Sequence, residues 1–257
     1  MNGLRQRLQH GELLLGQLVL EFFTPGLGPM LDACGLDFVI FDMEHGRCDI
    51  ALLEQLIASC RGSKIAPMVR VPDANFAPLA RVLDLGARGV MVPRVESRQQ
   101  AENIVRQLKY APQGTRGVAV GIAQDLYRPP NPDFFAQANE EIPIILQVET
   151  VDAFENLEAI VSTPGVDVAW IGQYDLTVSM GIPAQFDHPR VLEAMDDLVA
   201  VCNKHNVVPA FMPPNEKSAA HWISKGFRMI SLGSDIGVFQ AGMRSFKAYV
   251  IQEQGGH

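Results

Sequence analysis

Eight short apolar runs, rich in β-branched residues, recur along the 257-residue chain with amphipathic stretches between them. The runs begin near residues 16, 36, 65, 88, 142, 166, 207 and 227. Runs that stay apolar along their whole length, instead of alternating with polar residues, are typical of parallel strands buried on both faces of a sheet. Eight such strands alternating with helices in about 250 residues predict an α/β fold, a single TIM (β/α)8 barrel domain that spans the whole chain.

The stretches between the runs carry the periodicity and the end signals of helices. The first begins at Asp49, a residue type that caps helices, and ends at Gly62. We expect helices over residues 49–62, 74–87, 97–110, 151–162, 188–206, 215–226 and 236–254. A doubly wound open sheet is the alternative architecture, but the GxGxxG fingerprint that follows its first strand is missing from this sequence.

Residues 110–142, between the fourth and fifth runs, are the one long irregular stretch of the chain. Loops of this length inside a compact domain are usually lids, binding loops or subunit contacts. We expect one of these roles for this stretch.

The charge and the cysteine pattern narrow the class of protein. The formal net charge is −8, whereas nucleic acids and anionic membranes are bound mainly through an excess of Lys and Arg, so neither is an expected partner. The four cysteines show no CxxC spacing, and we expect reduced thiols in a cytoplasmic protein. The apolar run LLLGQLVLEFF is interrupted by Gln17 and Glu21, so it is expected to form the first strand instead of a signal peptide, and no apolar stretch is long enough to span a membrane.

Polar residues gather where the predicted strands end, and the carboxyl ends of barrel strands are where this fold places its chemistry. The residues are Asp42, Glu44, His45, Arg70, Gln147, Glu149 and Asp175. Each has an ordinary structural alternative when taken alone: a cap or loop charge for a carboxylate, a structural role for the histidine, and neutralisation of a neighbouring acid for the arginine. Because they converge from four strands, we interpret them together as a functional site.

Two carboxylates without Cys or His at ligand spacing suit a hard divalent cation such as Mg²⁺ or Mn²⁺, whereas zinc prefers nitrogen or sulfur ligands. Held beside Arg70 and His45, such a cation keeps positions for the carboxylate and ketone oxygens of a 2-oxo acid. It would act as a Lewis acid on the ketone, and Arg70 would add a fixed donor at the same oxygen. A Schiff-base lysine is the alternative, but Lys64 begins a strand at the opposite end, and the other lysines fall on helices or loops.

Residues 231–237, SLGSDIG, follow the last predicted strand and lead into the last predicted helix, where barrels often bind phosphate. A tight turn in which Ser234 or Asp235 caps the helix is the competing interpretation. Because Asp235 would repel a phosphate, no phosphate site is assigned.

Five motifs occur in order at matching strand ends: FDMEHG (41–46), PMVRVP (67–72), LDLGARGVMVPRVES (83–97), LQVET (146–150) and IGQYDL (171–176). They closely resemble the HpcH/HpaI aldolases, the metal-dependent class II pyruvate aldolases, and the likeness extends over nearly the whole chain. The resemblance implies a TIM barrel assembled as a hexamer, a trimer of dimers, in which the C-terminal helix packs on or is exchanged with a neighbouring subunit. It also implies a lyase that makes or breaks a carbon–carbon bond between a pyruvate-type enolate and an aldehyde.

The resemblance also implies roles for the strand-end residues. The family's metal ligands fall on Glu149 and Asp175, with Mg²⁺ or Mn²⁺ as the expected ion and Co²⁺ as a further candidate. Its catalytic base falls on His45, and the arginine that binds the pyruvate oxygens falls on Arg70. Gln147 matches a polar residue beside the metal.

Further roles follow from the same resemblance. Asp42 belongs to the hydrogen-bonding network around the histidine, and Asp84 matches an aspartate that reaches this network from a neighbouring subunit. The backbone around Tyr174 and Asp175 receives the pyruvate carboxylate. Glu44 is the member of FDMEHG to which we assign no chemical role.

The sequence departs from the family in two places. Gln173 stands where the family usually has proline, so we expect a looser turn around the carboxylate-binding amides. The loop after QGTRG also differs, and that loop helps to choose the aldehyde. We therefore expect an aldolase of 4-hydroxy-2-oxo acids, with a small 2-oxo acid and an unspecified aldehyde as partners. Another metal-dependent lyase or isomerase of 2-oxo or phosphorylated acids, and a non-catalytic sensor of 2-oxo acids, are the alternatives.

Overall fold

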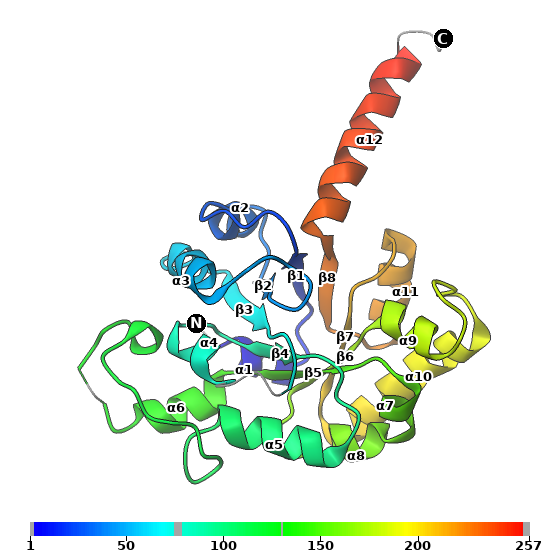
Figure 1. Cartoon of the computed structure of the whole chain (residues 1–257). Helices are drawn as coiled ribbons and strands as arrows, with labels where there is room; N and C mark the ends of the chain where they lie inside the picture. Colours follow the sequence, from blue (N-terminus) through cyan, green and yellow to red (C-terminus); the bar gives the residue numbers. More distant parts are fainter. Residues whose placement is uncertain (1–2, 75–78, 130, 254–257) are drawn as a thin grey trace.

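Eight parallel strands pair in sequence order, and β8 pairs with β1, so the sheet closes into a barrel (Figure 1). The structure is a computed structural model that describes residues 3–74, 79–129 and 131–253. The strands are β1 Leu14–Val19, β2 Phe38–Asp42, β3 Ala66–Arg70, β4 Val90–Val92, β5 Ile144–Val148, β6 Val168–Ile171, β7 Val208–Phe211 and β8 Met229–Ser234. The predicted barrel is confirmed, and each strand overlaps one of the eight apolar runs, with β1 beginning two residues earlier and β8 ending two residues later than its run.

Alternate residues of the strands form the interior of the barrel, and the remaining ones pack under the surrounding helices. On β2, Phe38 and Ile40 belong to the cluster that draws members from all eight strands, whereas Val39 and Phe41 belong to the outer cluster. The same alternation places Asp42 inside the barrel at its carboxyl end. Both layers are apolar, which is why the strands are apolar along their whole length.

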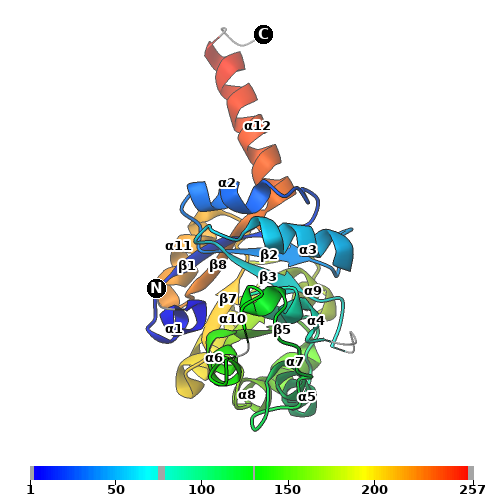
Figure 2. The same ribbon diagram turned by 90° about the vertical axis from the view of Figure 1, so that its left-hand side faces the viewer.

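Helices surround the barrel (Figures 1 and 2). They are α1 Leu4–Gln9, α2 Leu27–Ala33, α3 Ile50–Ser59, α4 Arg81–Asp84, α5 Arg98–Leu108, α6 Phe134–Glu141, α7 Val151–Glu155, α8 Leu157–Val161, α9 Gln173–Ser179, α10 Pro189–His205, α11 Glu216–Lys225 and α12 Asp235–Glu253, with a 3₁₀ helix, η1, at Ala123–Asp125. The predicted helices at α3, α5, α10, α11 and α12 are confirmed. Asp49 caps α3 as expected, because its carboxylate accepts the N–H of Leu52.

Two predicted helices differ from the structure. Within the described residues, the helix expected over 74–87 is the four-residue α4, and residues 75–78 of the prediction lie outside the described part of the chain. The helix expected over 151–162 is divided at Asn156 into α7 and α8. The Asn156 side chain donates to the backbone carbonyls of Glu96 and Asp152, so its amide competes with the helical hydrogen bonds there.

Several helices arise where none was predicted. The stretch expected to be irregular, residues 110–142, contains α6 and η1. Helices α1, α2 and α9 were also missed, and α2 contains Gly28 and Pro29, two residue types with low helix propensity. Tertiary contact compensates for this, because a Cβ at Gly28 would lie 2.3 Å from the Cys60 sulfur, which directly follows α3. Helix α2 is therefore fixed by close packing against the end of α3.

Helix α12 leaves the barrel after β8 and projects away from the other helices (Figures 1 and 2). Its base is held by Asp235, whose buried carboxylate accepts the backbone N–H groups of Leu20, Glu21 and Phe22 at 3.0, 2.9 and 2.6 Å. The Ser234 hydroxyl accepts the N–H of Gly237. The segment SLGSDIG is thus an ordered turn, and the Asp235 carboxylate occupies the place of an anion at these N–H groups. None of the helices in the described residues is long and apolar enough to cross a membrane.

Candidate active site

The centre of the candidate site is a buried ion pair between neighbouring strands at the carboxyl end of the barrel, which we call the mouth. Asp42 and Arg70 are register partners on β2 and β3, and both side chains point inward. The Arg70 guanidinium donates from Nε and Nη2 to the two carboxylate oxygens of Asp42, each at 2.7 Å, and Nη1 lies 2.9 Å from Glu44 Oε2. Burial by itself lowers the pKa of Arg70, but the two carboxylates outweigh it and raise the pKa, so Arg70 is a permanent cation.

The turn after β2 is organised by the same aspartate. The Asp42 carboxylate accepts the backbone N–H groups of Glu44 and His45 at 3.0 and 3.2 Å. A Cβ at Gly46 would lie 2.4 Å from the Asp42 carbonyl oxygen, so this tight turn requires glycine. The His45 side chain is 62% exposed, and its Nε2 lies 3.8 Å from Glu44 Oε2. Asp42 therefore holds the backbone of His45, and Glu44 is the carboxylate that faces the imidazole.

Glu149 follows β5 across the mouth and is a buried carboxylate without a cationic partner in direct contact among the described side chains. Its Oε1 accepts the Arg94 backbone N–H at 2.8 Å, and its Oε2 accepts from Gln147 Nε2 at 3.2 Å. Burial and the negative charges of Asp175 and Glu44 raise the pKa of Glu149 to about 7, although the Arg94 N–H acts in the opposite direction. A cation beside Glu149 would remove this electrostatic cost.

Two neighbours of Glu149 suit a cation. Gln147 is buried, and its side-chain Oε1 has no hydrogen-bond partner among the described residues. Asp175 lies in the first turn of α9 and is exposed, and its charge acts on both Glu149 and Glu44. Oxygen atoms of this kind are the ligands of hard divalent cations. No group of three or more His, Cys, Asp or Glu residues in the described chain could hold a metal, so water or substrate would supply the remaining ligands.

The turn between β6 and α9 brings Asp175 and Glu149 together. A Cβ at Gly172 would lie 2.1 Å from Glu149 Oε2, so only glycine lets the turn pass the carboxylate. Helix α9 begins at Gln173, whose buried amide lies 3.6 Å from the Met195 sulfur. The helix that carries Asp175 therefore forms with glutamine in the place of the family's proline.

Tyr174 lies beside this turn at the surface. Its ring is 60% exposed and packs edge-on against Phe186, with ring centroids 4.8 Å apart. The side chain is therefore directed toward the α9–α10 loop, and any contact with a substrate carboxylate is left to the backbone.

Asp84 lies apart from the other predicted site residues. It is on α4, and its carboxylate accepts from Arg116 Nη2 at 2.7 Å. Arg116 is buried, also donates to the Gln124 amide oxygen, and lies over the Tyr110 ring at 4.5 Å. Within the described chain, Asp84 thus belongs to a separate cluster on the outside of the barrel. It could join a mouth only in another subunit.

Sequence reasoning missed or undervalued four residues of these clusters. Glu44 was given no role, yet it contacts Arg70 and faces His45. Arg94 and Arg116 were not considered. Gly172 could have been noticed from its place between a buried strand and an acidic residue. That only glycine fits at this position is clear only from the distance to the Glu149 carboxylate.

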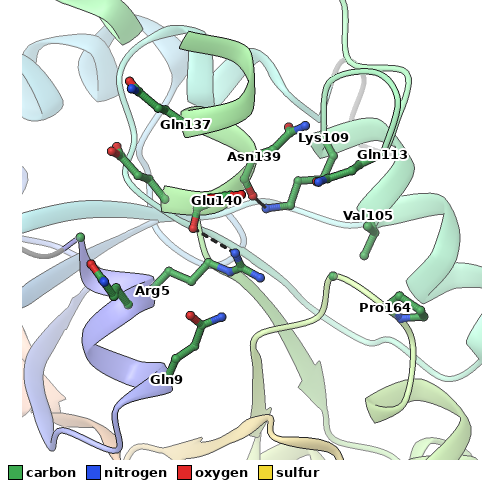
Figure 3. A pocket seen from close by; sticks show the side chains of 13 residues that line it. Arg5, Gln9, Val105, Lys109, Gln113, Gln137, Asn139, Glu140 and Pro164 are labelled. Carbon is green, nitrogen blue, oxygen red and sulfur yellow. Dashed lines mark hydrogen bonds between the residues drawn. The ribbon is translucent and has the colours of Figure 1, made fainter. Parts of the chain in front are cut away.

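A pocket lined in part by Lys109 lies away from the mouth (Figure 3). This cavity of about 830 Å³ is formed by α1, the end of α5, α6 and the turn before β6, and it is lined by Arg5, Lys109 and Asn139 among others. Lys109 donates from Nζ to the carbonyl oxygens of Asn139 and Ile142, and burial lowers its pKa to about 8. These elements meet at the amino end of the strands. Lys109 is therefore not a Schiff-base candidate for the mouth.

A closed parallel barrel whose mouth combines carboxylates, a locked arginine and an exposed histidine is typical of the class of barrel enzymes, which place their active sites at the carboxyl ends of the strands. The comparisons specify the family. The model of the HpcH/HpaI aldolase/citrate lyase family matches residues 23–241, and the chain belongs to this family of aldolases. The enzyme is accordingly a lyase with small-molecule substrates.

Three relatives illustrate the similarity. The chain is 34% identical over 212 residues to a 5-keto-4-deoxy-D-glucarate aldolase of Klebsiella pneumoniae subsp. pneumoniae, covering 82% of each chain. It superposes with a TM-score of 0.91 on an HpcH/HpaI aldolase from Desulfitobacterium hafniense DCB-2, at 28% identity and with 98% and 97% of the two chains covered. The citrate synthase SbnG gives a TM-score of 0.88 at 30% identity, with 98% of each chain covered.

Proposed function

We propose that the chain is a metal-dependent class II aldolase that cleaves or forms the C3–C4 bond of 4-hydroxy-2-oxo acids, giving pyruvate or a related 2-oxo acid and an aldehyde. One observation carries this proposal: a single mouth holds an arginine fixed by two carboxylates, an exposed histidine, and a pair of acids that no cationic side chain of the described residues pairs with. The whole chain is taken as one barrel domain, and a cytoplasmic location fits the same proposal.

Glu149 and Asp175 are the residues that would hold the metal, with Mg²⁺ or Mn²⁺ preferred and Co²⁺ as a further candidate. The residues fit such an ion, because Glu149 is buried with a raised pKa and Gln147 has an unpaired buried oxygen beside it. When bound, the metal supplies Lewis-acid stabilisation of negative charge on the ketone oxygen of the substrate.

Arg70 binds the same end of the substrate. A guanidinium has five N–H donors, and Asp42 and Glu44 engage three of them, which leaves donors for the substrate's oxo oxygen. Because Asp42 fixes the guanidinium plane, these donors are oriented before substrate binds. The substrate carboxylate is received by the backbone amides at Tyr174 and Asp175, and Gln147 lies beside it.

His45 moves the proton. In the cleavage direction it takes the proton of the C4 hydroxyl, directly or through a water molecule, while the C3–C4 bond breaks and the aldehyde forms. The carbanion at C3 is then protonated to give the methyl group of pyruvate. Positioned proton transfer of this kind typically contributes about 10² to 10⁴ in rate.

The assembly that completes the site is a homo-oligomer, for which we propose a hexamer built as a trimer of dimers. Helix α12 carries exposed apolar side chains along its length, among them Phe239, Met243, Phe246 and Tyr249 at 56, 58, 70 and 64% exposure. A neighbouring subunit packing against this helix would bury them. In the same assembly, Asp84 would reach the histidine in the mouth of a neighbouring subunit. This would explain why Asp84 lies outside the mouth of its own subunit.

Proton exchange of the pyruvate methyl group tests this function. In deuterated buffer with Mg²⁺ or Mn²⁺, the protein is expected to catalyse exchange, and a chelator is expected to abolish it. An arginine variant of the site, Arg70→Met, serves as the inactive control. Exchange that continues at full rate after metal removal would contradict the mechanism.

A second candidate function is condensation with an acceptor that is not an aldehyde. The observation in its favour is the similarity to the citrate synthase SbnG, which covers nearly the whole chain. Product analysis separates the two functions. An aldehyde released from any 4-hydroxy-2-oxo acid supports the aldolase, whereas methyl exchange without aldehyde release from a panel of such acids supports the second candidate.

A further inference from the structure

Arg116 is a buried cation away from the mouth, and it is more deeply buried than the carboxylate it pairs with. Its side chain is 1% exposed, whereas the Asp84 side chain is 31% exposed. Burying a charge is costly unless the charge is paired, and the pairing carboxylate is itself only partly shielded from water. The pair therefore holds a carboxylate near the surface by means of a buried cation.

The Arg116 guanidinium is fixed from several sides. Its Nη2 donates to Asp84 Oδ1 at 2.7 Å and to Gln124 Oε1 at 2.5 Å, and the guanidinium lies over the Tyr110 ring. The same Gln124 oxygen accepts from the Tyr110 hydroxyl at 3.1 Å, and the Arg116 backbone N–H donates to the Lys109 carbonyl. Helix α4, the 3₁₀ helix η1 and the end of α5 are therefore joined through this one side chain.

The orientation of the guanidinium leaves one donor unused. Arg116 Nε is buried and has no hydrogen-bond partner among the described residues. Most buried N–H groups in proteins are paired, and each exception requires an explanation, because an unpaired buried donor is unfavourable. The unused Nε indicates that Asp84 and Gln124 set the direction of the guanidinium, at the expense of the number of hydrogen bonds it makes.

Asp84 is held by one oxygen and keeps the other free for a further contact. Its Oδ1 accepts from Arg116, whereas its Oδ2 has no hydrogen bond within the described part of the chain. The stretch that carries Arg116 also exposes apolar side chains, those of Val118, Leu126 and Tyr127, at 66, 42 and 61%. Exposed apolar side chains of this kind mark surfaces that another protein covers, and the proposed assembly supplies a second copy of the chain.

We propose that Arg116 is a positioning residue for the active site of the neighbouring subunit: it holds Asp84 by one oxygen, so that the other oxygen engages the histidine in the adjoining mouth. This inference rests on the proposed aldolase function and on the sharing of Asp84 between subunits that was proposed with it. Arg116 then touches neither substrate nor metal, and it acts only through Asp84. Misplacing a positioned group by about 1 Å can lower a rate by about 10²-fold.

Steady-state kinetics of pyruvate methyl exchange measure this role. Arg116→Met is expected to lower kcat by about 10- to 100-fold and to change KM for pyruvate less than about twofold, because Arg116 does not contact the substrate. Arg116→Lys is expected to retain more of the activity, because it keeps the charge without the planar guanidinium. Arg81→Met is the matched control, since this exposed arginine lies on the same helix as Asp84, and it should change neither constant.

Coexpression of two variants tests whether Arg116 acts across the subunit boundary. Arg116→Met with His45→Ala should restore about a quarter of the wild-type kcat, since about one mouth in four has its own histidine and a neighbour with intact Arg116 and Asp84. Arg116→Met with Asp84→Ala should restore nothing, because no subunit then has both residues. If Arg116 served its own mouth, the second pair would recover activity and the first would not, which would overturn the inference.

An unchanged kcat in Arg116→Met, or an equal loss in Arg81→Met, also overturns the inference. The wild type separates this outcome from a failure of the proposed function. A wild type that catalyses no methyl exchange refutes the function and the inference together, whereas an active wild type with a fully active Arg116→Met refutes the inference alone. If the Arg116→Met chain does not assemble, Arg116→Lys takes its place in both coexpressed pairs, with the same expected pattern of recovery.

Discussion

Replacing Glu149 by glutamine should stabilise the metal-free protein above neutral pH. Burial raises the pKa of Glu149 to about 7, against an ordinary value of 4.5, so the folded state binds more protons than the unfolded state between these values. The free energy of unfolding of the wild type therefore falls as pH rises from 4.5 to 7. At about 1.4 kcal/mol per pKa unit, the difference amounts to about 3 kcal/mol above neutral pH. The isosteric amide of Glu149→Gln avoids this loss.

Local hydrogen bonding also permits the substitution. The amide that replaces the Glu149 carboxylate would keep an oxygen toward the Arg94 N–H, and Gln147 could turn its unpaired Oε1 toward the new NH₂ group. Urea unfolding in chelator, at fixed protein concentration and at about pH 4 and pH 8, measures the effect. We expect equal stability at the lower pH and a gain of up to about 3 kcal/mol at the higher one.

The exposed Glu193 on α10 provides the matched control, since Glu193→Gln should change stability little at either pH. Added Mg²⁺ should stabilise the wild type and not Glu149→Gln, because a ligand that binds only the folded state stabilises it by mass action. A Glu149→Gln protein that is less stable than wild type at the higher pH without metal, or a difference that does not vary with pH, would refute the reasoning.

Three further predictions follow from the same geometry. Gly172→Ala should weaken Mn²⁺ binding by about 10- to 100-fold in a titration, because the new Cβ displaces the Glu149 carboxylate, whereas Gly117→Ala, in open space, should leave binding as it was. Asp42→Asn should destabilise the protein by about 3 kcal/mol in urea unfolding by leaving Arg70 buried without its main partner; a loss below about 1 kcal/mol would contradict this account. Mixing the separately inactive chains His45→Ala and Asp84→Ala should restore about a quarter of the active sites, and no recovery of activity would exclude sharing between subunits.

The barrel could be predicted from the sequence because strands that are buried on both faces are apolar along their whole length. The helices were harder to predict. Helix α2 contains Gly28 and Pro29, and its stability comes from contact with the end of α3, which local propensity does not report. Likewise, the break at Asn156 depends on a side-chain bond to a distant carbonyl, that of Glu96.

The sequence indicates which residues lie at the strand ends, but it says less about which charged side chains pair with one another. Because Asp42 and Arg70 end neighbouring strands, the sequence places both at the mouth. Which charged group each of them contacts depends on the direction of its side chain, which the sequence does not give. Glu44 was undervalued for this reason, because its contacts with Arg70 and His45 exist only in three dimensions. The left-handed backbone of Arg94 could not be foreseen either, since arginine carries no signal for that conformation.

The Asp235 turn determines where the barrel ends along the chain. Three backbone N–H groups of the β1–α2 loop depend on this one carboxylate, although Asp235 is the first residue of the projecting helix. A chain shortened to end at Ser234 would leave these donors without their acceptor, whereas one shortened after Gly237 would keep the turn intact. For protein engineering, the boundary between barrel and arm therefore lies inside α12, about one turn beyond its start.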